Sequence, residues 1–302
     1  MVKGTFIYGA VILLIANFLN RFLGFFYQYL IMNYIGGEAF GLFNMVFPIY
    51  MMALVFTTAG IPLALSKMIA EAVSLKDFDR ARGIFRTALL FLFCSGAVIS
   101  LIVYFVSPFF AERLFPDPRV LPLFQICTPA IFVVSISSAF RGYFQGMQNM
   151  FPTAISQICE QVIRVSVGFF TAFTLMSKGI EWAASGLALG MLAGEIVGLG
   201  VIITQYLLHR SKRPQIPNSI KRPSSSFNIL KDLFRLSSPV TAGRLLATGL
   251  SSIDAMVIPK RLQVAGYTAR EATTLFGQLG GSVFTLFNFP SIFTLALATS
   301  LV

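Results

Sequence analysis

TALLFLFCSGAVISLIVYFV, residues 87–106, is one of several long apolar runs in this sequence. It contains no charged residue, and as a helix its 20 residues would span the roughly 30 Å hydrocarbon core of a bilayer. Of all 302 residues, 56% are hydrophobic and 12% are charged, whereas soluble domains carry about 25% charged residues. This composition argues against a soluble enzyme or a nucleic-acid-binding domain. The sequence predicts an all-α polytopic membrane protein.

Eight apolar segments are long enough to cross a membrane, and turns with Gly, Pro or charged residues separate them. We predict helices over residues 6–35, 40–58, 87–106, 120–140, 152–176, 182–208, 236–258 and 273–302. The first would be about 45 Å long, so it must tilt or bend in the membrane. Gly60 and Pro62 end the second, and an amphipathic stretch, Leu63 to Leu75, follows it.

A stretch rich in Pro, Ser, Lys and Arg, residues 210–227, separates the sixth and seventh predicted spans. Most of the 23 Lys and Arg residues lie on the same side of the membrane as this stretch and the N-terminus, with Arg141 counted there. The positive-inside rule therefore predicts that both are cytoplasmic. We interpret the basic stretch as this orientation signal, with no nucleic acid as a partner. We expect a six-helix N-terminal lobe over residues 1–209, a cytoplasmic linker over 210–227, and two helices of a second lobe over 228–302.

Short motifs recur between the two predicted lobes. Arg21-Phe22-Leu23 in the first span is echoed by Arg244-Leu245-Leu246 in the seventh. A Phe-Pro pair followed by two hydroxyl residues recurs as well: Phe47-Pro48 with Thr57-Thr58, and Phe289-Pro290 with Thr299-Ser300. A repeat unit of six spans preserves orientation, so the lobes would be parallel repeats. The sequence ends inside an apolar segment, and we expect it to be a fragment with a truncated second lobe.

Six charged residues lie inside predicted spans: Arg21, Glu160, Arg164, Glu195, Arg244 and Asp254. Each costs about 2.5–3.5 kcal/mol at mid-bilayer, so each needs a partner or a water-filled cavity. Five polar or small residues of the first span share one helical face: Asn17, Asn20, Arg21, Gly24 and Gln28. We interpret this stripe as the wall of a cavity, with a bend at Gly24 that would suit a gating helix. Alternatively, Arg21 pairs with an acid on a neighbouring helix and only fixes packing.

The other charged residues inside predicted spans each have a possible partner of opposite charge nearby. Glu160 and Arg164 are one helical turn apart, so they either neutralise each other or contact a ligand. Asp254 lies near the outer end of its span and either serves coupling or meets a basic residue of the following loop. Glu195 lies beside a ridge of glycines at every fourth position: Gly186, Gly190, Gly194 and Gly198. Such a ridge lets another helix approach closely, and we expect Glu195 to pair across that contact.

The sequence shows no constellation of catalytic or metal-binding residues. Cys94, Cys127 and Cys159 lie in apolar runs without CxxC spacing, and the single histidine, His209, lies in a basic stretch. Neither a disulfide framework nor a metal site is predicted. No nucleophile with a base and no phosphate-binding loop is present, so we expect no enzyme activity and no cofactor. Arginines suit anionic ligands, because a guanidinium makes paired contacts with phosphate oxygens.

Three motifs carry a family resemblance. Residues 140–149, FRGYFQGMQN, and 160–165, EQVIRV, resemble the signature of polysaccharide-biosynthesis flippases. These belong to the multidrug/oligosaccharidyl-lipid/polysaccharide (MOP) exporter superfamily, in a branch that contains sporulation proteins. Residues 20–25, NRFLGF, resemble the first-helix motif of the related lipid II flippases. In this sequence, Tyr27 and Gln28 replace a basic–acidic pair of those flippases, and Met52 stands near another expected arginine.

The resemblance implies two six-helix lobes around a central cavity with alternating access. It also implies transport of undecaprenyl-pyrophosphate-linked sugars across the bacterial inner membrane. We therefore expect a flippase for a lipid-linked oligosaccharide or peptidoglycan precursor, with Arg21 and Arg244 holding its anionic headgroup. The other expected substrate-binding residues are Asn17, Gln28, Glu160 and Arg164, and the expected gating or coupling residues are Asp254, Glu195 and Gly24.

Other functions stay open at the level of the sequence. A cation-coupled multidrug exporter of the same superfamily would need cavity acids without basic partners. A non-transporting scaffold would recruit cell-wall synthesis enzymes through the linker and the 63–75 stretch, and deletion of the linker would abolish its function but spare a flippase. A membrane glycosyltransferase would need large loops with catalytic acids, which the sequence lacks.

Overall fold

The structure, a computed structural model, describes residues 2–115, 117–211 and 226–283. Every regular element in these ranges is a helix. The α-helices are α1 (Val2–Tyr34), α2 (Gly37–Thr58), α3 (Ile61–Ser74), α4 (Phe78–Arg113), α5 (Leu121–Gly146), α6 (Phe151–Leu175), α7 (Ile180–Ser211), α8 (Ser226–Val264) and α9 (Ala269–Gln278). Short turns of other helix types are η1 (Pro118–Val120), η2 (Met176–Lys178) and η3 (Leu279–Val283).

Among the described residues, 6 helical segments are long and apolar enough to cross a membrane. They are formed by α1, by α2 with α3, by α4, by η1 with α5, by α6 with η2, and by α7. This confirms the predicted all-α polytopic membrane protein. The predicted seventh span, 236–258, lies within α8, which is 39 residues long. Because α8 contains Arg244, Asp254 and many hydroxyl residues, it is not apolar enough to join the six.

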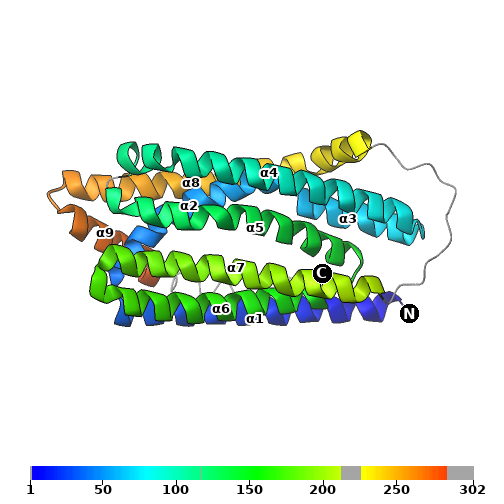
Figure 1. Cartoon of the computed structure of the whole chain (residues 1–302), viewed down its shortest axis with the longest axis horizontal. Coiled ribbons are helices and arrows are strands. Elements are labelled where there is room, and N and C mark those ends of the chain that lie inside the picture. The colour runs from blue at the N-terminus through cyan, green and yellow to red at the C-terminus, as the bar shows by residue number, and fades with distance from the viewer. Residues whose placement is uncertain (1, 116, 212–225, 284–302) are drawn as a thin grey trace.

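The long helices run side by side along the length of the molecule (Figure 1). The most extensive helix pair is α6 with α7, and α1 packs mainly on α6. α8 lies along α2 and α3, and α9 packs against α2. The described residues therefore form a lobe of six spanning segments, α1 to α7, with α8 and α9 packed against it.

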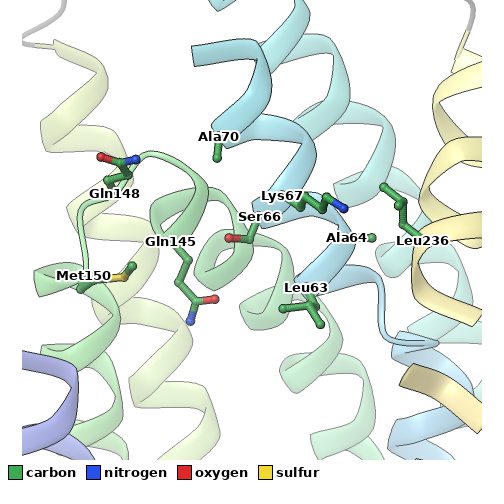
Figure 2. Close-up of a pocket in the computed structure, with 9 residues that line it drawn as sticks. All are labelled: Leu63, Ala64, Ser66, Lys67, Ala70, Gln145, Gln148, Met150 and Leu236. Carbon is green, nitrogen blue, oxygen red and sulfur yellow. The ribbon is translucent and has the colours of Figure 1, made fainter. Parts of the chain in front are cut away.

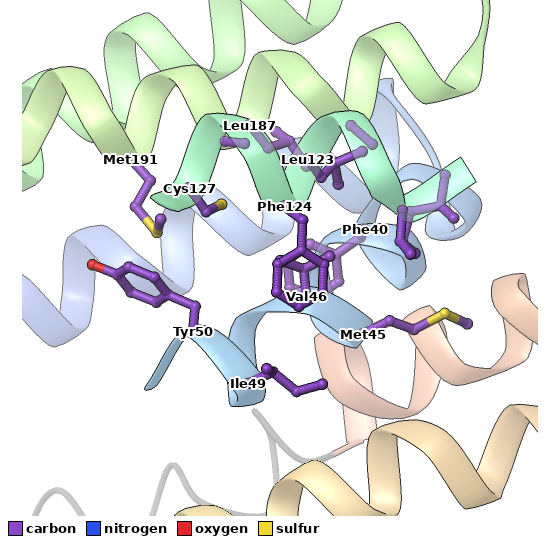
Figure 3. Packing of buried hydrophobic residues seen from close by; sticks show 14 of the residues in the cluster. Phe40, Met45, Val46, Ile49, Tyr50, Leu123, Phe124, Cys127, Leu187 and Met191 are labelled. Carbon is purple, nitrogen blue, oxygen red and sulfur yellow. The ribbon is translucent and has the colours of Figure 1, made fainter. Parts of the chain in front are cut away.

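The core of the six-helix lobe lies where α2 meets α5 and α7 (Figure 3). Met45 and Val46 of α2 and Phe124 of α5 are almost completely buried there. On the opposite side, Leu90 and Phe105 of α4 are 66% and 75% exposed, as expected for side chains that face lipid. Because lipid tails are as apolar as these side chains, close packing rather than removal from water holds such a core together.

The α2–α3 junction confirms the predicted break at Gly60 and Pro62. Gly60 has a φ of 63°, in the left-handed region, and Pro62 lies in the first turn of α3. Glycine adopts that conformation without a steric penalty, and proline is tolerated in a first turn because its missing N–H has no helical partner there. The second spanning segment is consequently a broken helix, α2 followed by α3.

Several helices extend beyond the predicted apolar runs. α4 has 36 residues rather than the predicted 20. It begins where the Asp77 carboxylate accepts a hydrogen bond from the Arg80 amide at 3.0 Å. Hydropathy marks only the part of a helix inside the apolar layer, whereas caps decide where the helix ends.

The predicted eighth span, 273–302, begins earlier in the structure. α9 starts at Ala269, where Thr268 and Glu271 form a capping box. Hydrogen bonds from the Thr268 amide and hydroxyl hold the pKa of the Glu271 carboxyl below its usual value. Residues 284–302, which contain Phe289-Pro290 and Thr299-Ser300, lie outside the described residues, as do linker residues 212–225.

Candidate functional site

Four charged side chains form a buried ion-pair network inside the six-helix lobe. Arg164 of α6 contacts Glu160 on its own helix at 2.6 Å and Glu195 of α7 at 2.7 Å. Arg141 of α5 contacts the second carboxylate oxygen of Glu160 at 2.6 Å. Glu160 is 8% exposed and Glu195 7% exposed. The structure thus confirms both predicted pairs, Glu160 with Arg164 and Glu195 across the α6–α7 contact.

The glycine ridge of α7 makes this network possible. A Cβ at Gly194 would lie 2.7 Å from the Glu160 carbonyl oxygen, and one at Gly190 would lie 2.9 Å from the Arg164 carbonyl oxygen. Both distances are shorter than Cβ atoms allow, so only glycine permits this helix separation. The close approach of α7 brings the Glu195 carboxylate within reach of Arg164. The prediction that the ridge is a helix-packing surface is confirmed.

Arg141 belongs to this network, which corrects its predicted place in the cytoplasmic layer. The predicted fourth span ended at Phe140, but α5 continues to Gly146 and carries Arg141 against Glu160. The apolar residues that follow Arg141 were the available signal, since they extend the same helix. With Arg141 included, the network contains two basic and two acidic residues, so its formal charges cancel.

Unpartnered polar atoms from α1, α2 and α7 are buried in the same lobe. Within the described residues, the Tyr27 and Tyr50 hydroxyls, the Asn20 side-chain oxygen and Glu195 Oε2 have no hydrogen-bond partner. The Tyr27 hydroxyl lies against Gly168 of α6. Buried polar groups normally bind a partner, so each of these atoms marks a place for water or for a change in pairing. From the sequence, Tyr27 was noted only as a departure from the lipid II flippase motif, and Tyr50 was not predicted to be a site residue.

The polar stripe of α1 has a different environment from the network. Asn17 and Arg21 are exposed, whereas Gly24 and Gln28 are partly buried. A Cβ at Gly24 would lie 3.7 Å from the Gln161 amide nitrogen of α6, and α1 runs unbroken through Gly24. Arg21 makes no ion pair among the described residues, so the alternative in which an acid neutralises it is not observed.

Arg244 and Asp254 of α8 are also exposed and, within the described ranges, form no ion pair. The structure therefore separates the six intramembrane charges into two groups. Glu160, Arg164 and Glu195 belong to the closed network, whereas Arg21, Arg244 and Asp254 are available to other partners.

A second ion-pair cluster joins α2 and η1 to α9. Glu38 of α2 contacts Arg119 of η1 at 2.7 Å and Arg270 of α9 at 3.0 Å. Asp117, which is 2% exposed, contacts Arg119 at 2.7 Å and accepts a hydrogen bond from Thr273 of α9 at 3.2 Å. Neither Arg119 nor Arg270 was predicted from the sequence to be a site residue. Asp117 is only two residues from Arg119, but Glu38 is 81 residues from Arg119 and 232 from Arg270, so spacing in the sequence does not reveal that contact.

This arrangement of helices is the fold of MOP-superfamily transporters. A MOP superfamily transporter from Pyrococcus furiosus superimposes with a TM-score of 0.66 at 14% identity, over 98% of this chain and 69% of that chain. Its published description notes a binding pocket of reverse polarity. At this identity the similarity shows the fold alone.

The sequence also matches the family described as polysaccharide biosynthesis protein, over residues 6–290, and the chain belongs to this family. It is 34% identical to Stage V sporulation protein B of Bacillus subtilis (strain 168), over 100% of this chain and 58% of that protein. It is 26% identical to Lipid II flippase MurJ of the same organism, over 89% of this chain and 51% of that protein. The chain thus spans little more than half the length of these curated relatives.

Proposed function

We propose that this protein is a flippase that moves a lipid-linked, pyrophosphate-bearing cell-wall or polysaccharide precursor across the bacterial inner membrane. The observation that carries the proposal is Arg21, an exposed arginine on the polar face of a spanning helix. No carboxylate among the described residues neutralises it. An uncompensated guanidinium in a membrane protein suits a phosphate group, with which it makes paired hydrogen bonds. The name of the relative Lipid II flippase MurJ supports a lipid-linked substrate.

Arg244 extends this proposal to the second lobe. It lies on α8, the first helix of that lobe, as Arg21 lies on α1 of the first, and it too is exposed and unpaired within the described residues. In our proposal, both arginines bind the headgroup, with Asn17 and Gln28 beside Arg21, while the polyprenyl chain stays in lipid. The orientation that we propose places the N-terminus and residues 210–227 in the cytoplasm.

The Glu38 cluster and the Arg141–Glu160–Arg164–Glu195 network are both consistent with a transporter whose two lobes open alternately to the two sides of the membrane. The cluster around Glu38 closes the lobes against each other at the proposed outer end, since it ties α2 and η1 to α9. The Arg141–Glu160–Arg164–Glu195 network lies between α5, α6 and α7, and we propose that its pairs rearrange during transport. In this proposal, the main role of Glu160 and Arg164 is to form and break their ion pair, and direct contact with the headgroup is secondary.

Substitution of Arg21 tests the proposal. In the full-length protein, Arg21→Ala removes charge-assisted hydrogen bonds worth about 1.5–3 kcal/mol, so translocation of the lipid-linked precursor should fall at least tenfold. Arg82→Ala is the matched control, because Arg82 is an exposed arginine at the proposed cytoplasmic end of α4, 53% exposed. Unchanged precursor translocation in Arg21→Ala, at equal protein levels, would refute the headgroup role.

Asp254 supports a second candidate function, a cation-coupled multidrug exporter. It is an exposed acid of α8 with no ion pair among the described residues, which is the kind of group that a cationic drug or a coupling ion would use. Asp254→Asn should abolish drug resistance conferred by an exporter. In a flippase it should change the ion dependence of precursor translocation and leave drug resistance unaffected.

A further inference from the structure

A cavity of about 490 Å³ lies between the two lobes at the end of the bundle that we propose to be cytoplasmic (Figure 2). It is bounded by α3, by the turn that joins α5 to α6, and by α8. The lining residues are Leu63, Ala64, Ser66, Lys67, Ala70, Gln145, Gln148, Met150 and Leu236. None of the nine is acidic, and one is basic.

Lys67 provides a positive charge that no other group in the described structure neutralises. Its side chain is exposed and extends from α3 toward Leu236 of α8 in Figure 2. Glu71, one helical turn further along α3, would be its natural partner. Instead, Glu71 pairs with Arg80 of α4 at 3.8 Å, and Lys67 makes no ion pair. The ammonium group is therefore available to an anion in the cavity.

The start of α6 adds a second positive feature at the cavity wall. Met150 is the N-cap residue of this 25-residue helix, and no side chain caps its first amide groups. The Thr153 hydroxyl in the first turn is buried and has no hydrogen-bond partner among the described residues. Pro152 in this turn has no amide proton, so the amide groups of Phe151 and Thr153, together with the helix dipole, favour an anion at this end of the helix.

Two glutamines complete the set of polar groups. Gln145 lines the cavity from the last turn of α5 and Gln148 from the α5–α6 turn. Their side-chain amides can donate hydrogen bonds to phosphate or sugar oxygens. Gln148 has a φ of 56°, a left-handed conformation that is uncommon outside glycine and fixes the path of this turn. The apolar residues Leu63 and Leu236 are exposed beside the cavity and suit the hydrocarbon next to a lipid phosphate.

We propose that this cavity is a loading subsite for the pyrophosphate of a lipid-linked substrate, occupied before the headgroup reaches Arg21. Lys67 binds the phosphate charge, the α6 N-terminus and the glutamine amides bind its oxygens, and Leu63 with Leu236 contacts the first part of the lipid chain. The inference rests on the proposed function, since it assigns an additional residue set to the same substrate. The loading subsite differs chemically from the Arg21 site, because its positive charge comes from a lysine, Lys67, at the boundary between the lobes.

The test is a binding titration of the full-length protein in detergent, with native mass spectrometry as the method that detects the bound ligand. The probes are undecaprenyl pyrophosphate, phosphatidylglycerol and inorganic pyrophosphate. Lys67→Gln should raise the Kd for undecaprenyl pyrophosphate about tenfold, since one charge-assisted contact is lost. Lys231→Gln is the matched control: it removes the same charge from α8, is also exposed and does not line the cavity. Its Kd should stay within about twofold of the wild type.

The three probes separate the possible ligands. A Kd for undecaprenyl pyrophosphate that is equal in Lys67→Gln and Lys231→Gln overturns the subsite. Equal dependence of phosphatidylglycerol binding on Lys67 would show that bulk anionic lipid fills the cavity, and equally tight binding of inorganic pyrophosphate would show that no lipid chain is recognised. Either result overturns the assignment.

Failure of the subsite and failure of the proposed function give different results. Unchanged binding in Lys67→Gln, combined with lost translocation in Arg21→Ala, overturns the subsite alone. A wild-type protein that does not bind undecaprenyl pyrophosphate overturns both.

Discussion

Arg164 holds two buried carboxylates at once, so its removal should destabilise the protein more than loss of any surface ion pair. The Glu160 and Glu195 side chains are 11% and 8% exposed. Glu160 would keep Arg141, but Glu195 has no other ion-pair partner among the described residues. Breaking a buried pair by removing one partner costs about 3–5 kcal/mol, because it leaves an uncompensated charge. We expect a loss of this size in the free energy of unfolding for Arg164→Met.

Two further variants identify the cause of that loss. Adding Glu195→Gln to Arg164→Met replaces the stranded carboxylate with a neutral amide, so it should restore about half of the lost stability. Arg82→Met is the matched control for the single change. The Arg82–Asp79 pair is 3.3 Å long, with side chains 53% and 49% exposed, and a pair of this kind contributes about 0–1 kcal/mol.

The measurement is the free energy of unfolding in detergent micelles, from denaturant titrations followed by circular dichroism, with all variants in the same micelle. If Arg164→Met destabilises the protein no more than Arg82→Met does, the network does not hold α6 to α7. If the added Glu195→Gln substitution restores nothing, the stranded carboxylate is not the cause of the loss.

Two other predictions concern the helix contacts. Gly190→Ala should lower the free energy of unfolding by about 1–3 kcal/mol, because its Cβ would collide with the backbone of Gly168. Gly200→Ala has open space around it and should raise stability by about 0.5–1 kcal/mol; equal effects in the two variants would refute the packing argument. Glu38→Gln weakens the contacts with Arg119 and Arg270, so hydrogen exchange of the α9 amides should accelerate about tenfold. Unchanged exchange would show that this cluster does not hold α9 against the lobe.

Features that depend on neighbouring positions in one helix were predictable from the sequence. Hydropathy located the six spanning segments, because the bilayer selects apolar runs of a fixed length. Glu160 and Arg164 could be paired in advance, since residues four apart lie on the same helical face. The glycine ridge of α7 predicted a close helix contact because small residues favour one whatever the partner. Helix ends were less predictable: α4 and α8 continue through charged residues once they leave the apolar layer.

Partners on different helices were decided by the tertiary structure alone. Glu38 and Arg270 are 232 residues apart, and nothing in their local sequences indicates that α2 and α9 are neighbours. In the sequence, Arg141 looks like an arginine at the membrane surface. In the structure, α6 places Glu160 beside it. Likewise, Lys67 stays without a counter-charge because α4 presents Arg80 to Glu71. The sequence by itself determined the six apolar segments that are long enough to span the membrane and most of the charges that they carry. Helix packing determined which of those charges neutralise one another and which stay available, because helical periodicity fixes the face of a residue but not the helix that this face meets.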